Sequence, residues 1–264
     1  MEIINRIIFR LKNQGLINLV KKGFQKLGNA IIPRRINKVK FYIKEFKNKM
    51  GLEIGGPSNV FLNNGPIPIY SQVKSLDNLD FSNQTIWYDR NSNLFTVNGA
   101  VLGKNFILEA SNLSSIKENT YDFILSSETL QHMANPILGL FEWNRVLKIG
   151  GNLLLILPNP IKTFDHKREI TMWNHLIDDY NRDMQEDDMT HYDEIILKHD
   201  LSRDRLAGNI NEFRERCKKN KILRAMHQHV FDQQLAEKAL LFTNFDVFGM
   251  EYHDNNLIIF SRKK

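Results

Sequence analysis

The chain has 264 residues, of which 42% are hydrophobic and 25% are charged, and its net charge is +6. This length and composition place it among ordinary globular proteins and allow it to bury a sizeable core. Its single cysteine, Cys217, excludes a disulfide framework, and we expect that thiol to be at the surface or half-buried. No apolar run approaches the roughly 20 residues that cross a bilayer, so we expect a cytoplasmic protein.

The first 50 residues form a basic segment. They contain 13 Lys or Arg against two Glu, a charge of +11, so the remainder carries −5. Large apolar residues recur here at helical spacing, which predicts an amphipathic helical arm over residues 1–50. This arm is expected to cap the main domain or to make peripheral membrane contact through residues 1–30. The basic residues are not interleaved with aromatics, so we predict no nucleic-acid partner.

Residues 51–264 alternate short apolar runs with helix-like stretches. This alternation is typical of an α/β fold with a doubly wound, mostly parallel, Rossmann-like sheet. The first five predicted strands are 52–54, 73–76, 105–108, 121–127 and 152–158.

Two further stretches complete this predicted domain. Residues 136–151 predict a helix that ends at Gly150 and Gly151, and residues 245–261 predict two strands joined by a turn. The polar, acid-rich residues 159–229 lie between the fifth strand and the last predicted helix. We interpret them as an acceptor-binding insertion.

Acidic residues and glycines stand where the early strands are predicted to end. In such a sheet, ligands bind beyond the carboxyl ends of the strands. Glu53 precedes the pair Gly55 and Gly56, which permits a tight turn and close approach of a ligand to the backbone. Asp77 is predicted to end the second strand, where a carboxylate can accept hydrogen bonds from ribose hydroxyls. The pattern fits an adenosine-containing cofactor, whereas the P-loop and dinucleotide motifs are missing from the sequence.

Four stretches in order, LEIGGPS, SLDNLDF, YDFILSSETLQHMANP and EWNRVLKIGGNLLLILP, resemble the motifs of class I S-adenosylmethionine-dependent methyltransferases. The resemblance covers about Gly51 to Pro158 and implies S-adenosyl-L-methionine as the cofactor. A third glycine, common in the first motif, is replaced by Ser58. The cofactor contacts that the resemblance implies are Glu53, Gly55, Gly56, Asp77, Ala110, Ser111, Leu113, Ser126, Ser127 and His132. Trp87 and Tyr88 are expected to shape the pocket wall.

All eight histidines follow residue 130, and six lie between 166 and 229. The resemblance extends to this histidine-rich tail, which in a bacterial branch of the family is often linked to surface-polysaccharide modification. It implies a small acceptor, nucleotide- or glycan-linked, such as a sugar or another substituent of a capsule or lipopolysaccharide precursor. The alternatives are a membrane-associated small molecule as acceptor, or a cofactor-binding module without catalysis.

A hydroxyl or amide acceptor must lose a proton, and histidine is a suitable base near neutral pH. The candidate bases are His166, His191, His227 and His229. Together with Asp165 and Glu194 they could also ligate a divalent ion. No spacing of the HExxH kind fixes such a site, so we predict no metal and expect activity to survive dialysis against a chelator.

Overall fold

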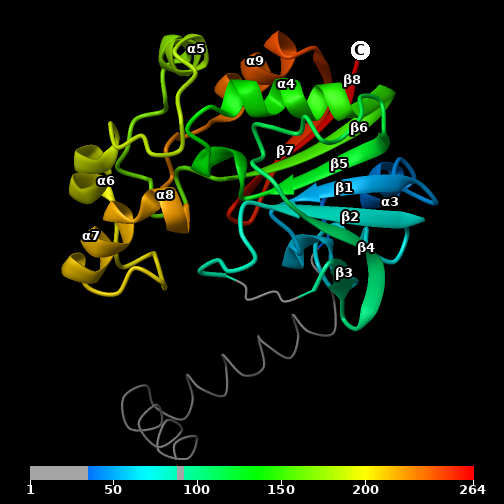
Figure 1. The fold of residues 1–264 in the computed structure, drawn as a ribbon, viewed down its shortest axis with the longest axis horizontal. Coiled ribbons are helices and arrows are strands. Elements are labelled where there is room, and N and C mark those ends of the chain that lie inside the picture. The colour runs from blue at the N-terminus through cyan, green and yellow to red at the C-terminus, as the bar shows by residue number, and fades with distance from the viewer. Residues whose placement is uncertain (1–34, 88–91) are drawn as a thin grey trace, which may run out of the picture.

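The computed structural model describes residues 35–87 and 92–264. Within them the chain forms an eight-stranded sheet of order β3-β4-β2-β1-β5-β6-β8-β7 (Figure 1). The strands are β1 (Met50–Ile54), β2 (Ser75–Asp80), β3 (Leu94–Val97), β4 (Ala100–Ile107), β5 (Tyr121–Ser127), β6 (Leu147–Pro158), β7 (Phe245–His253) and β8 (Asn256–Lys263). The neighbours from β4 to β6 pair in parallel, and β3, β8 and β7 add antiparallel edges. This sheet confirms the predicted fold class.

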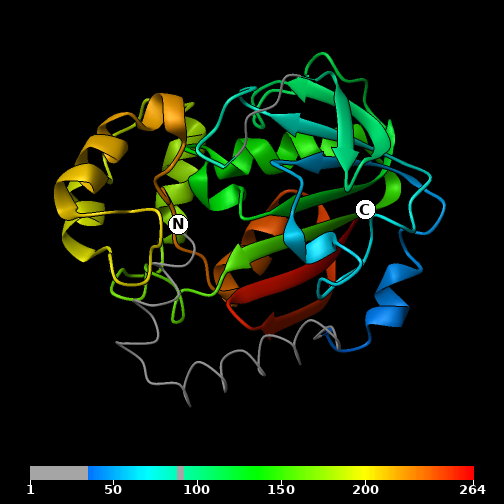
Figure 2. The same cartoon turned by 90° about the horizontal axis from the view of Figure 1, so that it is seen from below.

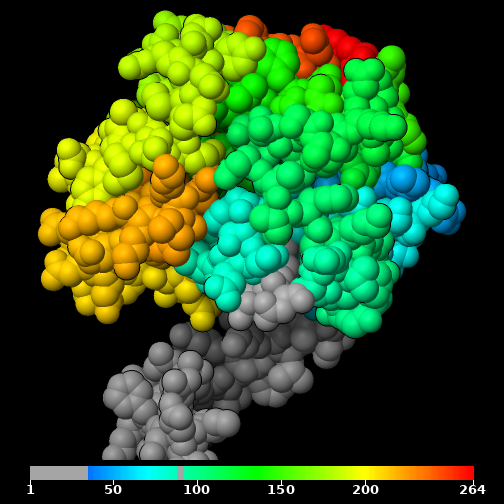
Figure 3. Space-filling model, in the orientation of Figure 1, coloured from blue at the N-terminus to red at the C-terminus, as the bar shows by residue number. Residues whose placement is uncertain are grey.

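Helices cover the sheet and build a lobe beside it. Figure 1 shows α4 and α9 on one face, and Figures 1 and 2 show α6, α7 and α8 of the insertion gathered to one side. In the space-filling view the insertion lies directly against the rest of the chain (Figure 3). The helices are α3 (Val39–Ile43), α4 (Pro136–Val146), α5 (Trp173–Asn181), α6 (Tyr192–Lys198), α7 (Ile210–Lys218), α8 (Asn220–Leu223) and α9 (Gln233–Phe242), with the short 3-10 helices η1 (Asn59–Phe61) and η2 (Leu130–His132).

Apolar side chains form a core on each face of the sheet. Ile124 of β5 packs in the cluster that includes Trp143 of α4, whereas the adjacent Phe123 packs in the cluster on the other face. Central parallel strands are buried on both faces, which explains the nearly continuous apolar run of β5. The insertion has its own small cluster, and Cys217 lies fully buried in it, so the expectation of a surface or half-buried thiol was wrong. Burial raises the pKa of this thiol to about 11.

The boundary between α4 and β6 differs from the prediction. Asn135 caps the helix by accepting from the Leu138 amide, and the helix ends at Val146 without reaching the two glycines. Gly150, with φ +73°, lies inside β6, where the pairing with β5 shifts register. A left-handed glycine is typical of a strand bulge as well as of a helix end, so the predicted glycine stop was wrong.

The second parallel strand is also longer than predicted. It continues past Asp77 to Asp80, because the polar residues within it have partners inside the fold. The Asp77 carboxylate accepts hydrogen bonds from the Tyr121 hydroxyl (2.9 Å) and from the Lys104 amide (2.8 Å). Asp80, not Asp77, therefore occupies the carboxyl end of β2.

The predicted basic arm lies mostly in residues 1–34, outside the described part of the chain. From residue 35 onward the segment packs on the sheet, with Ile36 and Phe46 buried in the second apolar cluster. Among residues 35–87 and 92–264, every helix is too short or too polar to cross a membrane.

Candidate active site

A cavity of about 450 Å³ lies where the parallel strands end. One side consists of strand ends and their loops, and the other consists of the insertion. Lining residues on the sheet side include Ile54, Gly55, Ser58, Leu79, Asp80, Ala110, Ser127 and Glu128, and those on the insertion side include Thr163, Phe164, Asp204, Arg216, Arg224 and His227. Trp87 also lines the cavity, whereas Tyr88 falls outside the described residues.

At Gly55, the loop after β1 presents backbone atoms instead of a side chain to the cavity. Gly55 has φ +78°, and a Cβ there would lie 2.5 Å from the Thr129 hydroxyl oxygen. Gly56 stands behind it, and its amide donates to the side-chain oxygen of Asn78 (3.0 Å). Of the two predicted glycines, only Gly55 lines the cavity.

Glu53 supports this loop from beneath. Its fully buried carboxylate accepts hydrogen bonds from the Ser58 amide (3.1 Å) and from the Tyr70 hydroxyl (2.9 Å). Ser58, at the position of the family's third glycine, lines the cavity and bonds to the Ser127 hydroxyl at 3.1 Å. The structure therefore places Glu53 behind the loop, where it fixes the shape of the cavity.

Only some of the predicted adenine and ribose contacts line the cavity. Asp80 and Leu79 at the end of β2 line the cavity together with Ala110. The Asp77 carboxylate instead bonds to Tyr121 of β5 and does not line the cavity. Leu113 is fully buried, with its amide bonded to Glu142. Ser111 does not line the cavity either. Asp80 was missed because the strand was predicted to end three residues too early.

Ser127 and Glu128 form the floor of the cavity at the end of β5, while Ser126 is fully buried in the strand. The Glu128 side chain is accessible to solvent but lies within the cavity, close to many protein atoms. This desolvation raises the pKa of Glu128 to about 7; His227 lowers it and Asp165 raises it by smaller amounts. Glu128 thus exchanges its proton near neutral pH.

His132 lines the same part of the cavity in neutral form. Burial first, and then the electrostatic interaction with His227, lower the pKa of His132 to about 3. Its Nδ1 lies 2.8 Å from the carbonyl oxygen of Met226, which can only accept, so Nδ1 carries the proton. The Nε2 atom of His132 is therefore a hydrogen-bond acceptor.

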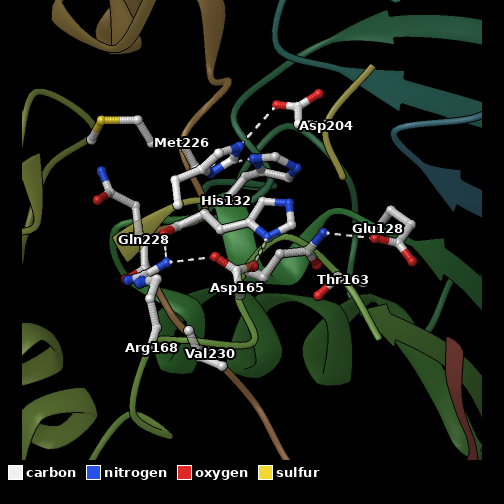
Figure 4. Close-up of polar contacts among 12 residues, drawn as sticks. Glu128, His132, Thr163, Asp165, Arg168, Asp204, Met226, Gln228 and Val230 are labelled. Carbon is white, nitrogen blue, oxygen red and sulfur yellow. Dashed lines mark hydrogen bonds and ion pairs between the residues drawn. The ribbon is translucent and has the colours of Figure 1, made fainter. Parts of the chain in front are cut away.

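His227 is the predicted base that reaches the cavity. Its Nδ1 lies 2.5 Å from Oδ2 of Asp165, and Oδ1 of Asp165 accepts from Arg168 at 3.1 Å. Figure 4 shows Asp165 and Arg168 on one side of His132 and Glu128 on the other. Burial opposes ionisation of Asp165, but its interactions with His227 and Arg168 prevail and hold its pKa at about 2. An ionised, fixed carboxylate thus orients the His227 ring.

The other three predicted bases lie elsewhere. His166 pairs with Asp200 at 2.9 Å and does not line the cavity. His191 and His229 join His175, which the sequence reasoning did not single out, in a separate cluster. Burial lowers the pKa of both His191 and His229, that of His191 to about 4.

Two arginines of the insertion line the cavity and had not been predicted. Arg216 pairs with Asp204 at 2.6 Å, and Arg224 pairs with Glu186 at 2.7 Å. The Nε atom of Arg216 is buried and has no hydrogen-bond partner among the described residues. Both arginines lie in a lysine- and arginine-rich stretch that resembles a solvated surface, so their positions gave no local signal.

Comparison with known proteins adds a family match and a fold match. A family model described as a methyltransferase domain matches residues 72–155. No curated protein matches the chain. A putative methyltransferase from Bacillus halodurans is 12% identical, with a TM-score of 0.50 over 86% of this chain and 97% of that chain.

Two other solved structures match over a similar share of this chain. A putative S-adenosylmethionine-dependent methyltransferase from Listeria monocytogenes is 13% identical, with a TM-score of 0.47 over 90% of this chain and 98% of that one. A methyltransferase from Methanosarcina mazei is 16% identical, with a TM-score of 0.48 over 87% and 98%. Residues 72–155 thus match a methyltransferase domain, and the surrounding sheet has the Rossmann-like fold of class I methyltransferases.

Proposed function

We propose that this chain transfers a methyl group from S-adenosylmethionine to a small acceptor held against the insertion. One observation carries the proposal: a single cavity joins the carboxyl ends of β1, β2 and β5 to the Asp165–His227 pair. A cofactor on the sheet side and an acceptor on the insertion side would meet in it. Holding the two in contact can itself lower the barrier by several kcal/mol.

The sheet side of the cavity fits the cofactor. Gly55 lines the cavity with its backbone, and a Cβ there would clash with the Thr129 hydroxyl, so the loop shape depends on glycine at this position. Asp80 offers a carboxylate to the ribose hydroxyls, and Leu79 and Ala110 offer apolar surface to the adenine ring. Glu53 and Gly56 contribute indirectly, by fixing the loop from behind.

The insertion side supplies a base. S-adenosylmethionine, when bound, would supply an electrophilic methyl group and keep the electrons of the broken carbon–sulfur bond. Nε2 of His227 would take the proton that the acceptor oxygen or nitrogen loses. Asp165 stabilises the imidazolium that forms through its bond to Nδ1.

We further propose an acceptor that is a nucleotide- or glycan-linked sugar of a capsule or lipopolysaccharide precursor. Support comes from the acceptor side of the cavity, which Asp204, Arg216 and the aromatic ring of Phe164 all line. Arg216 lines the cavity, where a guanidinium group can donate to a phosphate or hydroxyl oxygen. Carboxylates and guanidinium groups together suit a ligand rich in hydroxyls and phosphate.

A screen for methyl transfer tests this function. The purified chain is incubated with S-adenosylmethionine and a panel of nucleotide-activated sugars and glycan precursors, and release of S-adenosylhomocysteine is measured. We expect turnover with at least one panel member and loss of turnover in His227→Ala. Cofactor binding with no turnover on sugars would contradict the sugar proposal. Turnover on a lipid-like acceptor instead would identify a membrane-associated substrate.

A further inference from the structure

Four ligand-type side chains converge at a point outside the cavity. Nε2 of His175 lies 2.9 Å from Nε2 of His191, and Nε2 of His229 lies 3.0 Å from Oδ2 of Asp179. The same Oδ2 lies 3.3 Å from Nε2 of His175. One nitrogen from each of the three histidines lies within 4.8 Å of the other two. None of the four residues lines the cavity.

One hydrogen bond determines which nitrogen of His229 faces the cluster. Nδ1 of His229 lies 3.1 Å from the carbonyl oxygen of Met133, which can only accept, so Nδ1 carries the proton. In the neutral ring with this tautomer, the lone pair of Nε2 faces the Asp179 carboxylate. His229 and Asp179 are both nearly fully buried, so a proton or a metal ion must lie between these two atoms.

We propose that His175, His191, His229 and Asp179 bind one divalent transition-metal ion, with Zn²⁺ as the preferred occupant. Three imidazoles and one carboxylate form a ligand set suited to this class of ion. With each ligand about 2.0–2.1 Å from a tetrahedral ion, ligand atoms lie about 3.3 Å apart. Three of the six separations, at 2.9, 3.0 and 3.3 Å, are close to this value, and the nitrogens of the three histidines all lie within 4.8 Å of one another.

The surroundings match those of a metal site. Metal-bound histidines usually direct their other ring nitrogen to a carbonyl or carboxylate, as His229 does toward Met133. Nδ1 of His191 faces Oε2 of Glu194 at 4.0 Å, and Glu194 is in turn held by Arg168. Met133 thus orients the His229 ring, whereas Glu194 lies near His191 without a direct hydrogen bond.

The ion would have a structural role. Four protein ligands close a tetrahedral site and leave no open position for a substrate. The site would join α5, which carries His175 and Asp179, to the start of α6 at His191 and to the segment before α9 at His229. It would thereby fix the segment that carries His227. The proposal revises the expectation of no metal: His191 follows His175 by 16 residues and precedes His229 by 38, so no short motif marks the site.

Metal analysis of the untagged full chain tests the proposal. We expect about one transition-metal ion per folded chain by mass spectrometry, and a melting temperature that falls on treatment with a strong chelator and recovers with Zn²⁺. His191→Ala should lose both the ion and the thermal response. His166→Ala, a histidine of the same insertion outside the cluster, should keep both.

A second, milder variant tests the proposal even if His191→Ala fails to fold. Asp179→Asn is nearly isosteric and should bind the ion more weakly, so that a lower chelator concentration removes it. The proposal is overturned if the folded chain contains no metal and shows no thermal shift with Zn²⁺, Mn²⁺, Fe²⁺, Co²⁺ or Ni²⁺. Equal metal content in His191→Ala and His166→Ala would also overturn it.

Discussion

Nδ1 of His227 lies 2.5 Å from the carboxylate of Asp165. This contact holds the ring, and Nε2 is the nitrogen that remains for a ligand in the cavity. If His227 is the base, His227→Ala should lower kcat by about 100-fold or more, because positioned bases contribute on that scale. The affinity for S-adenosylmethionine should stay within about threefold, since His227 stands on the acceptor side. Steady-state kinetics and calorimetry measure the two effects, with His253→Ala of β7 as the matched control. Equal kcat in both variants would exclude His227 as the base.

The raised pKa of Glu128 predicts a pH-dependent preference for the charged cofactor. Near its pKa of about 7 the side chain gains negative charge as the pH rises, and a nearby sulfonium would favour that form. From about pH 6 to about pH 8, the Kd of S-adenosylmethionine should therefore fall several-fold, whereas that of S-adenosylhomocysteine, with its neutral sulfur, should change little. Calorimetry at both pH values checks this. A Glu128→Gln variant that keeps the wild-type pH dependence would disprove the role of Glu128.

Two glycines with similar φ angles allow the effect of backbone strain to be measured apart from the effect of a steric clash. Gly55 has φ +78° and no room for a Cβ, whereas Gly150 has φ +73° and open space around it. Gly150→Ala should cost about 1–2 kcal/mol of stability from the left-handed backbone alone, with no change in cofactor affinity. Gly55→Ala should cost more and should weaken cofactor binding by about tenfold or more. Urea unfolding and calorimetry measure both; equal cofactor affinity in the two variants would count against the proposed loop.

The sequence predicted elements well where local pattern and tertiary environment agree. β5 was predicted with its bounds, because an apolar run between polar residues is what a strand buried on both faces requires. The hairpin of β7 and β8 also follows its turn residues, with Asp254 at φ +51°. The end of β2 was mispredicted because Asp77 and Asn78 resemble a strand end locally. Their partners Tyr121 and Asn105 are distant in sequence.

The candidate site was less predictable for the same reason. The sequence identified the glycine loop and the histidine-rich insertion, but spacing alone could not show that His227 reaches the cavity while His229 faces Asp179. That division depends on how the insertion folds back against β5 and η2. The cavity residues Arg216 and Arg224 were hidden among surface-like charges for the same reason.

The central claim is that the strand ends hold S-adenosylmethionine with Asp80 at its ribose. Calorimetric titration of S-adenosylhomocysteine into the wild-type chain, Asp80→Asn and Asp77→Asn tests it most directly. The wild type should bind one ligand, Asp80→Asn should bind about 10-fold to 100-fold more weakly, and Asp77→Asn should match the wild type within about threefold. No binding by the folded wild-type chain, or a loss confined to Asp77→Asn, would contradict the claim.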